Sequence, residues 1–178
     1  MLSLAILGLL ALVVARFDGG AAVRIAGAAA VGDGDSLTIG GERIRLIGID
    51  APELDQTCRR DDRDYACGRQ SRQALVALIG ALAVACEGRG KDRYERLLAD
   101  CRAGDVDLGR AQVEAGWAVA YGDYEREEAA AREAGRGIWA GPFERPRDWR
   151  DSHGAAAEAE HVRPSALLDW LRAILGIP

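Results

Sequence analysis

Residues 36–49, SLTIGGERIRLIGI, constrain the fold more than any other stretch of the chain. Two runs in which apolar and polar side chains alternate are joined by a Gly-Gly dipeptide, a pattern typical of a tight β-hairpin. The two-residue turn also sets the register, so Ser36 pairs with Arg45 and Ile39 with Glu42. The predicted core face carries Leu37, Ile39, Ile44 and Leu46, and the opposite face carries Ser36, Thr38, Arg43 and Arg45. Arg45 is therefore expected to point away from the core although it lies in mid-strand.

The rest of the chain predicts further strands and three helices around this hairpin. Strands are predicted at 23–31, 82–87 and 96–101, and helices at 68–82, 106–116 and 124–137. The apolar stripe of the first helix consists of Ala74, Leu75, Leu78 and Ile79. Asp105 is the expected N-cap of the second helix, and Gly135 or Gly137 the expected end of the third. This order of elements indicates an α+β fold with a small barrel, not an alternating βαβ sheet.

Length and charge limit what the chain can be. Its 178 residues suit one domain with tails, and its formal net charge is -5. An acidic protein does not attract nucleic acid through its overall field. Any nucleic-acid binding would therefore need a local basic groove, and otherwise the charge serves solubility.

Both ends of the chain differ from the predicted domain at 23–150. Residues 1–22 begin with an apolar run that resembles the hydrophobic part of a signal peptide, although no Lys or Arg precedes it. An uncleaved membrane anchor or a misplaced start codon are the alternatives. Residues 151–164 are interpreted as a linker, and 165–178 as an amphipathic helix. That helix either packs back on the domain or contacts a membrane surface or a partner.

Four cysteines point to disulfides: Cys58, Cys67, Cys86 and Cys101. An even number behind an apolar leader favours two disulfides and export to the periplasm or beyond, whereas a cytosolic protein would hold four free thiols. The predicted antiparallel pairing of 82–87 with 96–101 brings Cys86 close to Cys101. Zinc or thiol-redox chemistry is disfavoured, because no C-x-x-C occurs and both histidines lie near the C-terminus.

Acidic residues flank the hairpin at both ends. Asp35 belongs to a D-G-D sequence before it, and Asp50 to D-A-P-E after it. The two carboxylates are expected to converge on one hard cation such as Ca²⁺, leaving room for water and a phosphate. Glu53 is then a candidate general base, and Arg45 a candidate phosphate clamp. The alternatives are a plain turn, a helix capping box and a solvated arginine.

The sequence VGDGDSLTIGGERIRLIGIDAPE resembles the active-site hairpin of the thermonuclease (staphylococcal or micrococcal nuclease) family. KDRYERLLADC resembles the family's second motif, VEAGWAVAY and AREAGRGIW its later segment, and FERPRDWR an extension of bacterial members. The resemblance covers roughly residues 23–150. It implies an OB-fold, a five-stranded barrel with flanking helices, and calcium-dependent hydrolysis of DNA and RNA that leaves 3′-phosphate ends. By position it assigns Asp35, Asp50 and the Ala51 carbonyl to calcium, Arg45 and Arg96 to the phosphate, and Glu53 to the attacking water.

The same region supplies candidate substrate contacts. Tyr94, Tyr121 and Tyr124 are expected to stack bases or bind a terminal phosphate, with packing as the alternative for the last two. Arg93 is expected to add local positive potential unless it is a solvated turn residue. One departure from the family pattern is Glu95, where glycine is usual. If that turn needs a positive φ, Glu95 costs about 1–2 kcal/mol, and its carboxylate is placed to pair with Arg96.

These features predict an exported, monomeric, calcium-dependent nuclease that acts on DNA and RNA. The N-terminal apolar segment and the C-terminal helix offer membrane contacts. The competing hypothesis is a catalytically silent OB-fold that binds nucleic acid or protein. A binding module has no need for Glu53 together with Arg45 and Arg96.

Overall fold

The computed structural model describes residues 22–161, with side chains as far as His153. The helix expected at 165–178 and all but the last residue of the leader expected at 1–22 lie outside these residues. Within the described part, no helix combines the length and the apolar character that a membrane span needs.

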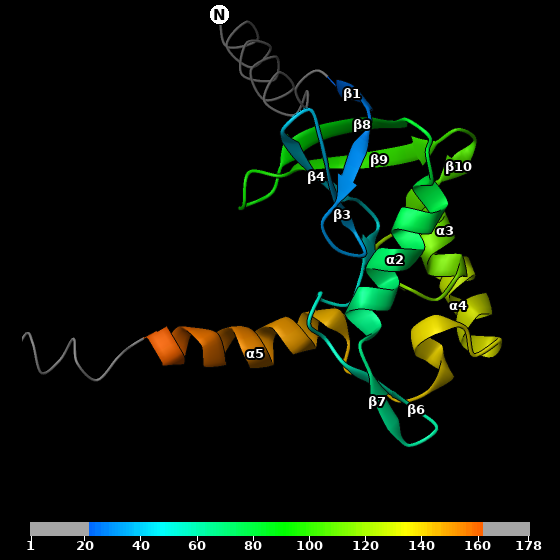
Figure 1. The fold of residues 1–178 in the computed structure, drawn as a ribbon, viewed down its shortest axis with the longest axis vertical. Coiled ribbons are helices and arrows are strands. Elements are labelled where there is room, and N and C mark those ends of the chain that lie inside the picture. The colour runs from blue at the N-terminus through cyan, green and yellow to red at the C-terminus, as the bar shows by residue number, and fades with distance from the viewer. Residues whose placement is uncertain (1–21, 162–178) are drawn as a thin grey trace, which may run out of the picture.

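A curled sheet forms the upper part of the molecule in Figure 1. Its main strands are β1 (Val23–Gly27), β2 (Ala29–Val31), β3 (Ser36–Ile39), β4 (Glu42–Leu46), β8 (Val84–Lys91) and β9 (Leu97–Ala103). They are ordered β1-β8-β9-β4-β3-β2, with β4 and β9 parallel. The predicted first strand breaks at Ala28, so that β1 pairs with β8 while β2 pairs with β3. Because this one segment supplies both edge strands, the sheet curls into a half-barrel, which agrees with the predicted α+β fold of OB type.

The central hairpin has the predicted register. Ser36 pairs with Arg45 and Ile39 with Glu42. The four apolar residues of the predicted core face are at most 3% exposed: Leu37, Ile39, Ile44 and Leu46. They share one core with β9 and with Leu75 and Ile79 of the first helix. The alternation of side chains along the hairpin therefore determines which face is buried.

Helices and short strands lie beside and below the curled sheet (Figure 1). The helical elements are α2 (Cys67–Ile79), α3 (Leu108–Glu114), α4 (Glu125–Glu133), η1 (Gly137–Ala140) and α5 (Pro146–His161). The short strands are β5 (Ile49–Asp50), β6 (Cys58–Arg60), β7 (Arg63–Tyr65), β10 (Val106–Asp107) and β11 (Val119–Ala120). α3 packs against α2, α4 and β9, whereas α5 projects away from the body of the molecule (Figure 1).

Two predicted boundaries need correction. Residues 106–107 pair with β9 as β10, so α3 starts later and Asp107, not Asp105, is its N-cap. The range 151–164, predicted as a linker, is helical as far as His161 because it continues α5. Its alanine and glutamate residues favour a helix.

The four cysteines form two disulfides, Cys58–Cys67 and Cys86–Cys101. Cys86 lies directly opposite Cys101 in the β8–β9 pairing, as the predicted antiparallel arrangement required. The first disulfide joins the first residue of β6 to the first residue of α2 and so closes the segment that contains β6 and β7.

Candidate active site

Close packing at Gly34 places Asp35 directly before β3. A Cβ atom on Gly34 would lie 1.9 Å from Ser71 Oγ of α2, so only glycine fits. The Gly34 carbonyl accepts a hydrogen bond from Gln112 Nε2 at 2.7 Å. The Asp35 amide donates to Asp33 Oδ1 at 3.0 Å, so D-G-D is also a turn. The turn and the packing together hold the Asp35 side chain in a nearly buried position.

Arg45 bridges Asp35 and Asp50. Its Nη1 donates to Asp35 Oδ1 at 3.1 Å and its Nη2 to Asp50 Oδ1 at 2.8 Å. The carboxylates are only 3% and 5% exposed, so this is no solvated surface arginine. Burial, together with the nearby carboxylates of Asp33 and Asp50, raises the pKa of Asp35 to about 7, although Arg45 and a backbone amide oppose the shift. The two acids that flank the hairpin do converge.

The D-A-P-E segment is held against this pair. β5 pairs with β11, and the Ala51 amide donates to Asp35 Oδ2 at 3.0 Å. No helix begins at residues 50–53, so the capping-box interpretation is wrong. The Glu53 amide donates to Gln56 Oε1 at 3.2 Å, and the Glu53 carboxylate is about one-third exposed. Glu53 therefore reaches the site from an ordered loop.

Arg96 follows the turn between β8 and β9. Its Nε donates to Asp92 Oδ2 at 2.7 Å, and its amide donates to Asp92 Oδ1 at 3.0 Å. Glu95 does adopt a positive φ of 61°. Its expected pairing with Arg96 is not what the structure has, because Arg96 is paired with Asp92. The phosphate contact assigned to Arg96 would require it to share or leave that partner.

These residues surround a groove of about 660 Å³. Its lining consists of Asp33, Arg43, Arg45, Glu53, Asp92, Arg93, Tyr94, Arg96, Leu98 and Arg150. Five arginines face three carboxylates, so the groove is locally basic although the chain is acidic overall. A basic groove is the feature that nucleic-acid binding requires in an acidic protein.

The other two candidate tyrosines lie outside this lining. Tyr121 is 66% exposed just after β11. Tyr124 packs against the core, and its hydroxyl donates to Asp107 at 3.4 Å. Burial and the Asp107 carboxylate raise the pKa of Tyr124 to about 12. Packing is therefore the better description of Tyr124.

Sequence reasoning missed two residues of the site. Arg150 of α5 donates from Nη1 to Asp50 Oδ1 and Glu53 Oε1, both at 2.9 Å, and from Nη2 to Asp50 Oδ2 at 3.1 Å. Gln56 is fully buried and joins the Glu53 amide to the segment before α5. The only available signal for Arg150 was its place in FERPRDWR, which resembles a family extension.

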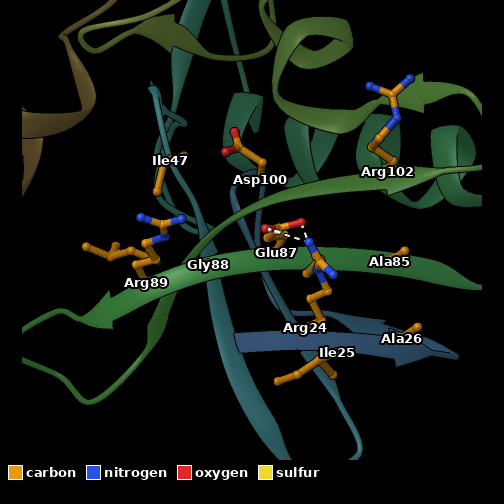
Figure 2. A pocket seen from close by; sticks show the side chains of 12 residues that line it. Arg24, Ile25, Ala26, Ile47, Ala85, Glu87, Gly88, Arg89, Asp100 and Arg102 are labelled. Atoms are coloured by element: carbon orange, nitrogen blue, oxygen red, sulfur yellow. Dashed lines mark hydrogen bonds and ion pairs between the residues drawn. The ribbon is translucent and has the colours of Figure 1, made fainter. Parts of the chain in front are cut away.

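A larger hollow of about 880 Å³ lies over β1, β8 and β9 (Figure 2). Its ion pair joins Arg24 Nε to Glu87 Oε2 at 3.0 Å, and both side chains are more than half exposed. Its other carboxylate, Asp100, is exposed too. Size alone therefore does not make it the catalytic candidate, because it lacks the buried charged groups of the groove around Arg45.

The donor set near Arg45 fits a hard cation in part. Asp35, Asp50 and the Ala51 carbonyl offer only oxygen ligands, the type that calcium prefers. A positive charge there would offset the burial that raises the pKa of Asp35. Within residues 22–161, however, no group of three or more His, Cys, Asp or Glu residues is arranged to hold a metal. Water or substrate oxygens would have to complete the coordination.

The chain is similar to several known proteins. Residues 43–141 match the family model described as staphylococcal nuclease homologue. The chain is 42% identical over 139 residues to the succinoglycan biosynthesis protein ExoI of Rhizobium meliloti, across 73% of this chain and 72% of that protein. It is 33% identical over 133 residues to an uncharacterized endonuclease of Haemophilus influenzae, across 67% of this chain and 69% of that protein.

A plant relative is longer. The chain is 34% identical over 128 residues to the probable staphylococcal-like nuclease CAN3 of Oryza sativa subsp. japonica. The match covers 67% of this chain and 32% of that protein. The similarity to CAN3 therefore concerns only part of the plant chain.

Proposed function

The chain belongs to the staphylococcal nuclease family, and from this we propose that it is a calcium-dependent endonuclease that cleaves DNA and RNA. One observation carries the proposal: Arg45 bridges two nearly buried carboxylates at the wall of a basic groove. Burying charges of this kind costs stability, so such a cluster is typical of a functional site. A phosphate backbone supplies the negative charge that Arg45, Arg93 and Arg96 of this groove would bind.

The side chains of the groove divide the chemistry among them. Arg45 and Arg96 bind the scissile phosphate and stabilise the charge that grows on its oxygens in the transition state. Glu53 accepts a proton from the attacking water, whose oxygen forms the new bond to phosphorus. The bond to the 5′ oxygen breaks, and that oxygen takes a proton from solvent water to leave a 5′-hydroxyl opposite a 3′-phosphate. Calcium held by Asp35, Asp50 and the Ala51 carbonyl would add positive charge beside the phosphate.

Broad specificity follows from contacts to the backbone. Arginines bind phosphates of any sequence, and Tyr94 and Arg93 on the same groove offer a stacking face and added positive charge. Neither interaction depends on the sugar or on the identity of the base. DNA and RNA are therefore both proposed as substrates.

Cleavage of single-stranded DNA and RNA tests the proposal, in Ca²⁺ and in EDTA, with Glu53→Gln and Arg45→Lys. We expect activity only with Ca²⁺, with a loss of roughly 100- to 10,000-fold for Glu53→Gln and roughly 100- to 1,000-fold for Arg45→Lys. Asp55→Asn, an exposed change on the same loop, is the control. Activity that survives both EDTA and Glu53→Gln would exclude this mechanism. Binding without any cleavage would favour the silent OB-fold module.

The two disulfides support export to an oxidising compartment. Intact mass after alkylation, with and without reductant, tests this in protein isolated from its native compartment. A mass shift of four alkylated cysteines without reductant would contradict export. Cleavage of the leader, the monomeric state and membrane contact remain predictions.

A further inference from the structure

Helix α5 inserts a charged side chain into the groove although most of the helix projects away from the barrel (Figure 1). Nη1 of Arg150 contacts both Asp50 Oδ1 and Glu53 Oε1, each at 2.9 Å. Nη2 contacts the second oxygen of Asp50 at 3.1 Å. One guanidinium therefore joins a proposed calcium ligand to the proposed general base.

Glu53 depends on this contact for its orientation. It lies in a loop between β5 and β6, where no regular element fixes its side chain. Among the described side chains, Arg150 alone donates a hydrogen bond to its carboxylate. We propose that Arg150 is a positioning residue, which holds Glu53 and Asp50 in one arrangement and makes α5 part of the active site. The proposal rests on the nuclease function proposed above.

The base of α5 is fixed to the same loop, so the contact is preorganised. Pro146 is buried at the first position of the helix, where proline is favoured. Gln56 binds the Glu53 amide through one end and the Glu144 carbonyl through the other. Arg150 therefore approaches Glu53 from a helix whose start is tied to the Glu53 loop. These contacts distinguish the Arg150 ion pair from mobile ion pairs on the surface, which contribute little to stability.

Geometry explains why an arginine is needed. The planar fork of a guanidinium places two nitrogens against two carboxylates at once, whereas a lysine ammonium is a single point charge. Arg150 also shares Asp50 Oδ1 with Arg45. Asp50 thus already accepts three hydrogen bonds, and a cation beside it opposes the binding of a second cation. Arg150 should therefore favour catalysis while weakening calcium affinity.

A fall in kcat together with a rise in calcium affinity distinguishes a positioning role of Arg150 from a role in stability alone. The experiment compares wild type, Arg150→Gln and Arg150→Lys, measuring kcat and KM at saturating Ca²⁺ and calcium affinity by titration calorimetry. For Arg150→Gln we expect kcat to fall by roughly 10- to 100-fold with KM nearly unchanged. Calcium should bind about 5-fold more tightly because a repelling charge is gone. Arg150→Lys should not restore kcat.

Arg147→Gln is the matched control, because Arg147 is exposed on the same helix and does not line the groove. It should leave kcat, calcium affinity and the melting temperature unchanged. A normal kcat in Arg150→Gln would overturn the inference. So would a joint fall in kcat, calcium affinity and melting temperature, which would mean a purely structural role. If wild type does not cleave nucleic acid, the proposed nuclease function is wrong. The calcium affinities of wild type and Arg150→Gln then test the role of Arg150 separately. Equal affinities would overturn the present inference as well.

Discussion

Gln56 donates a hydrogen bond from Nε2 to the carbonyl oxygen of Glu144 at 2.7 Å, although 88 positions separate the two residues. Its Oε1 accepts from the Glu53 amide at 3.2 Å. The side chain is fully buried. One amide group therefore pairs a backbone donor of the active-site loop with a backbone acceptor next to α5.

Gln56→Leu should destabilise the protein by about 1–3 kcal/mol, because a side chain of similar volume leaves two partly buried backbone groups without their partner. We also expect kcat to fall, since Glu53 and α5 lose their common anchor. Urea unfolding and cleavage rates measure the two effects. Gln73→Leu, an exposed glutamine of α2, serves as the control. Equal stability of both variants would show that water satisfies the freed groups.

Gly68→Ala should lower both stability and activity, against the usual preference for alanine in helices. A Cβ atom on Gly68 would lie 1.7 Å from the Glu53 carbonyl oxygen, so α2 and the loop must separate. Overpacking of this kind costs about 1–3 kcal/mol. At Gly109 of α3 the nearest atom is a Tyr124 side-chain carbon at 3.2 Å, which makes Gly109→Ala the milder comparison. Thermal unfolding and kcat of both variants test the expectation; a greater loss in Gly109→Ala would contradict it.

Local pattern predicted the hairpin and the convergence around it. A Gly-Gly turn with alternating side chains leaves one register, and that register alone sets Arg45 beside Ser36 and close to both acids. The roles of Arg150 and Gln56 were not predicted, because their partners lie about 90 to 100 positions away. No periodicity in the sequence encodes contacts between residues so far apart. Asp105 was mistaken for the α3 cap because a two-residue bridge to β9 displaces the helix start. Contacts between residues far apart in the sequence therefore determine the features that the local pattern did not predict.

Glu95→Gly should stabilise the protein slightly and leave cleavage unchanged. Glu95 has a φ of 61°, where a side chain costs about 1–2 kcal/mol. Glycine relieves that strain but adds about 0.4–1 kcal/mol of unfolded-state entropy, so the net gain is at most about 1.6 kcal/mol. Arg96 pairs with Asp92, so removing the neighbouring carboxylate should not disturb it. The reverse change at Gly90→Ala, where φ is 75°, should destabilise. A fall in melting temperature for Glu95→Gly would refute the strain argument.

Asp92 should stabilise the turn before Arg96 in a pH-dependent way. Burial acts to raise the pKa of Asp92, but hydrogen bonds from Arg96 and the Tyr94 amide outweigh it and hold the pKa below its ordinary value. A carboxyl group whose pKa is lower when folded stabilises the fold above its unfolded pKa of about 4. This contribution is lost as the pH falls through the lower folded value.

Asp92→Asn should therefore cost about 1 kcal/mol at pH 7, a modest value because the groove is open to solvent. The gap to wild type should be constant at pH 5–7 and shrink below about pH 4, since protonated Asp92 and asparagine carry no charge. Urea unfolding at pH 7, 5 and 3 measures the gap, with exposed Asp105→Asn as the control. If the difference in unfolding free energy between wild type and Asp92→Asn is the same at pH 3, the charge on Asp92 does not stabilise the turn.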